Sequence, residues 1–163
     1  MIAEMIITGD GAIARYERHW EHSVQEVWAW LTENNKLSQW FPELHVEELH
    51  EGGTIRFKMP NGTFDKLTIT ELKMNSVLEL TWWDNTMRFE LDPETHGCLL
   101  VLTEEIKEIT DHTPKDLAGW HMCLEVILAL LDGRTIESRT EEWKIWYEKY
   151  IHAVNEFTSA KSK

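Results

Sequence analysis

Residues 77–91 read VLELTWWDNTMRFEL, and this stretch decides the fold. Apolar side chains alternate with polar ones before and after Asp84-Asn85, which is typical of strands with one covered face and one solvated face. Turn-forming residues between two such segments predict a β-hairpin. We therefore expect two antiparallel strands, over 77–83 and 86–92.

The same alternation continues on both sides of this hairpin. Further strands are expected where segments of period two lie between turn residues, of which Asn61-Gly62 is one example. These segments are 12–20, 44–49, 53–59, 64–72 and 98–108. The sequence therefore predicts an antiparallel sheet of six to seven strands.

Two short helices are predicted after the first strand. Ser23 and Glu26 have the spacing of a capping box, so the first helix is expected over about 24–33. The segment KLSQWF follows as a shorter helical turn and ends at Pro42.

Two more helices are predicted near the C-terminus. Thr113-Pro114 has the features of an N-cap followed by Pro at the first helical position, and the long helix that it starts is expected to reach Leu131. A last helix is expected over about 140–157. Strands followed by helices indicate an α+β protein.

The composition is that of one globular domain, which we expect to cover residues 1–163 with no linker or second domain. No apolar run is long enough to cross a membrane and no segment resembles a secretory signal, so a cytoplasmic location is expected. The net charge of −13 opposes binding to nucleic acid or to an anionic membrane surface.

The motifs of common cofactors and metals are not found in the sequence. His19 and His22 are three residues apart, so on a strand they face opposite sides, and no third ligand follows at a suitable spacing. Neither a GxSxG motif nor a nucleotide-binding Gly pattern occurs. We expect no metal and no cofactor.

The order of these segments resembles the START-like, or helix-grip, superfamily of polyketide cyclase-like SRPBCC domains. It is most similar to the bacterial branch related to the activator of the heat-shock protein 90 ATPase. The resemblance rests on SVQEVWAWLTENNKLSQWF, GGTIRFKM, SVLELTWW, TMRFELDPETHGCLLVLTEE, GWHMCLEVILALLDG and EEWKIWYEKY. It implies a curved sheet wrapped around a long C-terminal helix, with a cavity between them in which many relatives bind a small apolar molecule.

We expect such a cavity to be lined by the bulky inward-facing residues of the strands and of the long helix. These are Phe57, Leu80, Trp82, Met87, Phe89, Leu102, Trp120 and Leu124. Trp28, Trp40 and Phe41 are candidates for its entrance, because the resemblance places their segment at the rim. The alternative is that these three aromatic residues fix the short helices to the sheet edge.

Glu104 and His121 are the candidate catalytic residues if the protein is an enzyme. Glu104 follows Leu100 and Leu102 at two-residue spacing along one strand, so its carboxylate is expected to point to the same inward face as these leucines. His121 lies on the apolar face of the long helix. Carboxylate and imidazole groups can perform acid–base chemistry. The alternative is a Glu that reaches solvent at a strand end and a His that is hydrogen-bonded in the core.

Three functions remain open from the sequence. The first is binding of a small apolar or amphipathic molecule. The second is a protein-binding module that contacts a chaperone or a second copy of itself. The third is a cyclase- or hydrolase-type enzyme that uses Glu104 and His121.

Overall fold

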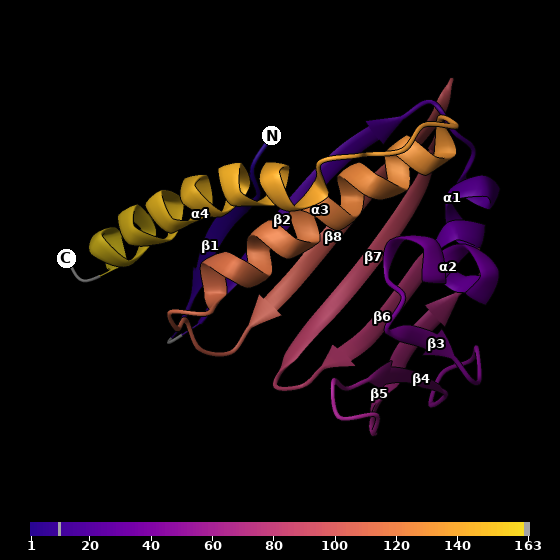
Figure 1. Ribbon diagram of the computed structural model, residues 1–163, viewed down its shortest axis with the longest axis horizontal. Coiled ribbons are helices and arrows are strands. Elements are labelled where there is room, and N and C mark those ends of the chain that lie inside the picture. The colour runs from indigo at the N-terminus through magenta and orange to yellow at the C-terminus, as the bar shows by residue number, and fades with distance from the viewer. Residues whose placement is uncertain (10, 162–163) are drawn as a thin grey trace. The chain divides into compact units, whose positions relative to one another are not determined.

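The computed structural model describes residues 1–9 and 11–161, and it contains eight strands and four helices in this part of the chain (Figure 1). The strands are β1 (Glu4–Thr8), β2 (Gly11–Trp20), β3 (Leu44–Val46), β4 (Thr54–Lys58), β5 (Phe64–Lys73), β6 (Val77–Trp82), β7 (Asn85–Glu94) and β8 (Gly97–Ile106). The helices are α1 (Val24–Thr32), α2 (Asn34–Trp40), α3 (Thr113–Leu131) and α4 (Arg139–Lys161).

The strands form one open antiparallel sheet in the order β1-β2-β8-β7-β6-β5-β4-β3. This order, with two short helices after β2 and a long helix after β8, is that of the α+β helix-grip fold, so the predicted class is confirmed. The prediction of six to seven strands was one too low, because β1 was not expected. Ile6 and Ile7 are adjacent and both exposed, so β1 lacks the alternation of apolar and polar residues from which a strand is predicted.

Two compact units make up the chain. Unit 1 contains Met1–Tyr16 and Glu105–Lys163, and unit 2 contains Glu17–Glu104. The boundaries fall inside β2 and β8.

The β6–β7 hairpin of unit 2 turns one residue earlier than the sequence predicts. Trp82 pairs with Asn85, so the two turn residues are Trp83 and Asp84 and not Asp84 and Asn85. This register places Leu80 opposite Met87, so the buried side chains of the two strands share one face. The structure therefore corrects the turn and moves Asn85 into the sheet.

The short helices of unit 2 are held by side chains at their ends. The predicted capping box is confirmed, because the Ser23 hydroxyl accepts a hydrogen bond of 3.2 Å from the Glu26 amide. The Trp40 indole donates to the Trp30 carbonyl at 2.8 Å and connects α2 to α1. Asn34 begins α2 two residues before the predicted turn, and its amide both accepts from and donates to the backbone of Val46 in β3.

Helices α3 and α4 pack against each other in unit 1 (Figure 1). Helix α3 has the predicted limits, but Thr113 is not its N-cap. His112 takes that position, and the Thr113 hydroxyl accepts a hydrogen bond from the Thr110 amide at 2.9 Å. None of the helices described is long and apolar enough to cross a membrane.

Candidate functional site

An aromatic cluster lies on the covered side of the sheet in unit 2, and it consists of Phe41, Phe57, Trp82 and Trp83. Phe41, Phe57 and Trp82 contact one another edge to face, with ring centroids 5.7 to 5.9 Å apart. Trp83 adds contacts of 4.9 Å to Phe57 and 5.1 Å to Trp82. Edge-to-face pairs at these distances are each worth about 0.5–1.5 kcal/mol beyond burial. The cluster therefore forms a connected apolar surface built from the C-cap of α2, β4, the last residue of β6 and the β6–β7 turn.

Trp83 is the exposed member of this aromatic cluster. Its ring is 47% exposed, and its indole nitrogen donates to the Asp65 carboxylate at 2.8 Å. Its backbone has a φ of 53°, in the left-handed region that bulky residues rarely adopt. Such a conformation costs about 1–3 kcal/mol and is typical of turns and binding sites. The strained turn holds an indole ring at the edge of the cluster.

A buried polar pair lies next to the aromatic cluster. The Glu104 side chain on β8 is fully buried, as its parity predicts, and the Asn85 amide donates to its carboxylate at 3.1 Å. Asn85 pairs with Trp82 across the hairpin, and residues paired in this way project to the same face of a sheet. A carboxylate and an amide therefore stand beside the aromatic rings within unit 2.

A second buried polar group surrounds His121 in unit 1. The His121 ring is fully buried, and its Nδ1 lies 2.8 Å from the Tyr150 hydroxyl, which also accepts a hydrogen bond of 3.0 Å from the Ala3 amide. Trp146 stacks on the imidazole at a centroid distance of 3.8 Å. The other ring nitrogen, Nε2, lies 3.6 Å from the Glu125 carboxylate.

The residues predicted to line a cavity are distributed over both units. Phe41, Phe57 and Trp82 are brought together in the aromatic cluster. The others in unit 2 are buried, namely Trp28, Trp40, Leu80, Met87, Phe89 and Leu102. Trp120 and Leu124 are buried in α3 of unit 1. The part of all these residues in ligand binding stays a prediction.

Sequence reasoning missed five residues that contact the candidates. Asn85 was assigned to a turn, and Trp83 was not assigned a role. Tyr16, Trp146 and Tyr150 contact His121, and only the helical spacing of Trp146 and Tyr150 indicated a shared packing face. A stricter count of the hairpin register would have identified Asn85.

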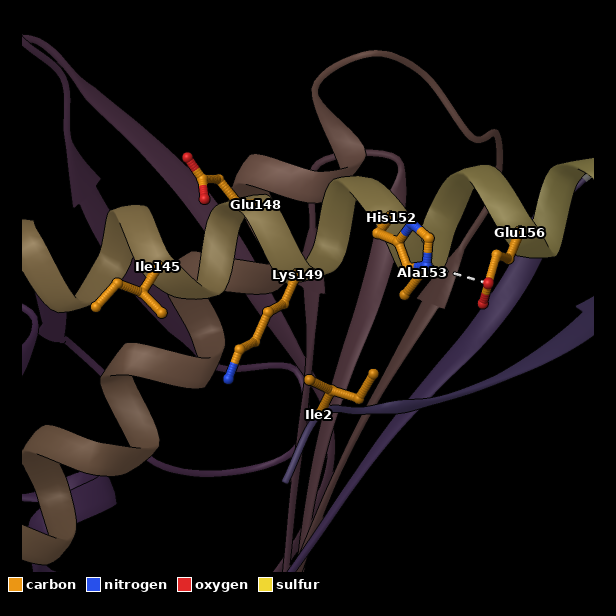
Figure 2. Close-up of a pocket in the computed structure, with 7 residues that line it drawn as sticks. All are labelled: Ile2, Ile145, Glu148, Lys149, His152, Ala153 and Glu156. Atoms are coloured by element: carbon orange, nitrogen blue, oxygen red, sulfur yellow. Dashed lines mark ion pairs between the residues drawn. The ribbon is translucent and has the colours of Figure 1, made fainter.

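Two surface pockets lie within single units. One, of about 470 Å³, lies along α4 in unit 1, and Figure 2 shows that Lys149 of this helix and Ile2 are among the residues that line it. The other, of about 500 Å³, lies in unit 2 between the start of α1 and the β7–β8 turn. Neither is lined by the residues predicted for the ligand cavity. No group of three or more His, Cys, Asp or Glu side chains that could hold a metal is found among the described residues.

The thiol of Cys98 does not provide a nucleophile. Burial raises the pKa of Cys98 to about 11, so the thiolate that would react is scarce near neutral pH.

On the other face of the sheet, Arg88 binds the carboxylates of Glu71 and Glu79 at 3.1 and 2.8 Å. The hydrogen bond from Arg88 lowers the pKa of Glu71, and this ion pair stabilises the outer face of β5, β6 and β7.

Comparison with known proteins gives a match to one family model and to several solved structures. The family model described as Activator of Hsp90 ATPase homolog 1-like protein matches residues 21–132. Among solved structures, a conserved protein of unknown function from Enterococcus faecalis, EF2215, is 26% identical over 94% of this chain and 91% of its own, with a TM-score of 0.85.

A second solved structure, CalU16 from Micromonospora echinospora, is 19% identical over 93% of each chain, with a TM-score of 0.69. Its similarity concerns the fold. Comparison with curated proteins gives no match.

Proposed function

Since the chain belongs to the family of Activator of Hsp90 ATPase homolog 1-like proteins, we propose that it binds a small apolar or amphipathic molecule at the covered face of the sheet in unit 2. The proposed site combines the aromatic cluster with the Glu104–Asn85 pair. The ligand has an apolar, preferably aromatic, body and one hydrogen-bond donor. A cytoplasmic location is part of this proposal.

The observation that carries the proposal is the buried carboxylate beside the aromatic cluster. Glu104 is fully buried and bound by Asn85. Burial of a carboxylate is costly, and an apolar residue would pack the same strand position without that cost. Small-molecule sites are mostly apolar, with a few polar groups that orient the ligand. The arrangement in unit 2 has this composition.

The chemistry of the pair defines the polar part of the ligand. The carboxyl oxygens of Glu104 accept hydrogen bonds, as the bond from Asn85 shows, so Glu104 selects a hydroxyl or an amine on the ligand. The edges and faces of Phe57 and Trp82 suit the apolar body, because aromatic rings prefer edge-to-face and offset contacts. We therefore expect a phenol or an alcohol to bind more tightly than its methyl ether.

This expectation can be tested with 1-naphthol and 1-methoxynaphthalene, using isothermal titration calorimetry. The naphthol should bind more tightly to the natural protein, and Glu104→Gln should weaken naphthol binding about tenfold, as the loss of one good hydrogen bond predicts. The methyl ether should bind both proteins alike. No binding of either compound, or an unchanged naphthol affinity in Glu104→Gln, would contradict the proposal.

A matched pair of aromatic substitutions tests the apolar part of the site. Phe57→Ala removes a ring at the centre of the aromatic cluster and should weaken both compounds. Phe64→Ala removes a ring that is 49% exposed and lies over Arg56 at 4.6 Å, away from the cluster, and it should leave both affinities unchanged. Equal effects of the two substitutions would show that binding does not use the cluster.

An enzymatic role for Glu104 is a narrower form of the same proposal. Its side chain is fully buried and hydrogen-bonded, as acid–base groups in enzymes often are. If a reaction is found, Glu104→Gln should abolish turnover and retain the fold. Retention of full turnover would remove Glu104 as the base.

A protein-binding role is the second candidate function. The description of the matched family names activation of the Hsp90 ATPase, and a chaperone contact for this chain is a proposal that rests on that description. A separate observation, the exposed apolar residues of β1, favours contact with a protein surface. Co-sedimentation with purified Hsp90 tests the chaperone contact, and absence of a complex at about 100 µM of each protein would contradict it.

A further inference from the structure

The two edge strands of the sheet differ in how well they are protected. Strand β3 has three residues, its apolar side chains Leu44 and Val46 are buried, and Pro42 lies just before it. Short length and nearby Pro are devices that prevent an edge strand from pairing with another chain. Strand β1 has five residues and contains neither Lys nor Pro, and its Ile6 and Ile7 are 44% and 50% exposed.

Strand β1 is also held in place. The Ala3 amide, immediately before β1, donates to the buried Tyr150 hydroxyl of α4. Within the part of the chain that the structure describes, β1 pairs with β2 on one side only. Alternate backbone N–H and C=O groups therefore point away from the sheet along an ordered, apolar edge.

We infer that β1 pairs in antiparallel fashion with β1 of a second copy of this chain, about a two-fold axis at Ile6. In this register Ile6 faces the Ile6 of the other copy, Met5 faces Ile7, and Glu4 faces Thr8. All five residues of the strand are then paired. Such a contact is isologous, as in most protein homodimers.

Charge and side-chain pattern favour this register over its neighbours. A two-fold axis at Glu4 would set two carboxylates opposite each other. An axis at Met5 would set Ile7 and Thr8 opposite Ala3 and Ile2, which lie outside the strand. The axis at Ile6 keeps the glutamates apart and leaves each beside Arg15, its partner on β2. Like charges directly opposite are destabilising in a sheet, and apolar pairs are stabilising.

The second copy also extends a face that is already apolar. Met5 pairs with Ala14 and Ile7 with Ala12, so these four side chains lie on one face of the sheet. Ala12 and Ala14 are fully buried, whereas Ile7 is half exposed at the end of this row. Pairing of two β1 strands would place Met5 of one copy beside Ile7 of the other and cover that exposed surface.

The predicted dimer is weak and depends on salt. A contact between two five-residue strands is smaller than a standard stable interface, so the dissociation constant should lie in the range of about 1–500 µM. Each chain carries a net charge of −13, and added salt should therefore tighten the dimer by screening repulsion.

Sedimentation equilibrium of the full chain tests this inference. Ile6→Lys sets two lysines opposite each other at the axis and should weaken the dimer about tenfold or more. Ile145→Lys is the matched control, because Ile145 is an exposed residue of α4 outside β1, at 56% exposure, and it should leave the dimer unchanged. Mixing Ile6→Lys with Ile6→Glu should restore a dimer of one copy of each.

Cysteine cross-linking tests the register directly. Residues opposite each other in antiparallel strands have Cβ atoms about 4.5–5.5 Å apart, close to the spacing of a disulfide. Ile6→Cys should therefore cross-link with itself on oxidation. Glu4→Cys and Thr8→Cys should cross-link only when the two variants are mixed. Cys98 and Cys123 are buried and should not react.

Three results would overturn the inference. A chain that stays monomeric up to about 500 µM does not form this dimer. The edge of β1 would then be a pairing site for a strand of another protein. A dimer that Ile145→Lys weakens as much as Ile6→Lys uses a different surface. Self-cross-linking of Glu4→Cys would show that the register is wrong.

Discussion

The left-handed backbone of Trp83 predicts an unusual order of stability among substitutions at this position. Trp83 has a φ of 53° in the two-residue turn between β6 and β7. Only Gly adopts this conformation without a steric cost. We expect Trp83→Gly to be more stable than Trp83→Ala, the reverse of the order found at most ordered positions.

The expected magnitudes follow from the contacts of the ring. Both substitutions remove two aromatic contacts, to Phe57 at 4.9 Å and to Trp82 at 5.1 Å, worth about 0.5–1.5 kcal/mol each. Both also remove the hydrogen bond to Asp65, worth about 0.5–1.5 kcal/mol. Trp83→Ala should therefore lower the free energy of unfolding by about 2–4 kcal/mol. Trp83→Gly should lose about 1 kcal/mol less, because it relieves the strain that Ala retains.

Equilibrium unfolding in urea, followed by far-ultraviolet circular dichroism, measures this difference. Asp84 is the matched control, because it lies in the same turn and its φ is not positive. There Asp84→Ala should be at least as stable as Asp84→Gly. If Trp83→Ala proved as stable as Trp83→Gly, the backbone of the turn would not be strained and the reasoning would be refuted.

Three further predictions concern ionisable groups. Asn85→Asp sets a second carboxylate 3.1 Å from Glu104 in place of the amide, so its free energy of unfolding should fall at neutral pH and recover on acidification, as urea titrations at several pH values would show. The hydrogen bond that His19 donates to the Glu94 carboxylate raises the pKa of His19 above its ordinary value of 6.5, so this group stabilises the fold fully below about pH 6.5 and less as pH rises through the raised value. Glu94→Gln should lower the His19 pKa measured by NMR, and an unchanged value would exclude the pairing. Cys98, with its pKa raised to about 11, should resist alkylation at about pH 8 until the protein is unfolded, as mass spectrometry would detect.

The elements of the fold were predictable wherever the apolar period was clear. The alternation around Leu78–Trp82 and Met87–Leu91 located β6 and β7, and the Ser23 capping box located the start of α1. Strand β1 escaped detection because Ile6 and Ile7 are adjacent, and a strand whose apolar residues are exposed on both faces has no period-two signal.

The candidate residues were predictable, but their partners were not. Parity indicated that Glu104 is buried, since neighbouring residues of a strand alternate between faces. Its partner Asn85 was missed because the predicted turn contained it, whereas the hairpin turns one residue earlier and places Asn85 in β7. The contact of His121 with Tyr150 depends on how α4 packs against α3, which no local pattern specifies.

The hydroxyl of Tyr150 has a consequence for how the chain is made. It joins the Ala3 amide to the His121 ring, and the first of these partners is 147 residues earlier in the sequence. During synthesis the N-terminal strand leaves the ribosome first, and the last helix that anchors it leaves at the end. Contacts between such distant residues form late, because the entropy of closing the loop must be lost before they form.

Until that moment α4 does not hold the start of β1 in place. A truncation that removes Tyr150 would make this condition permanent. Completion of the C-terminal helix is therefore the step that fixes the start of the N-terminal strand.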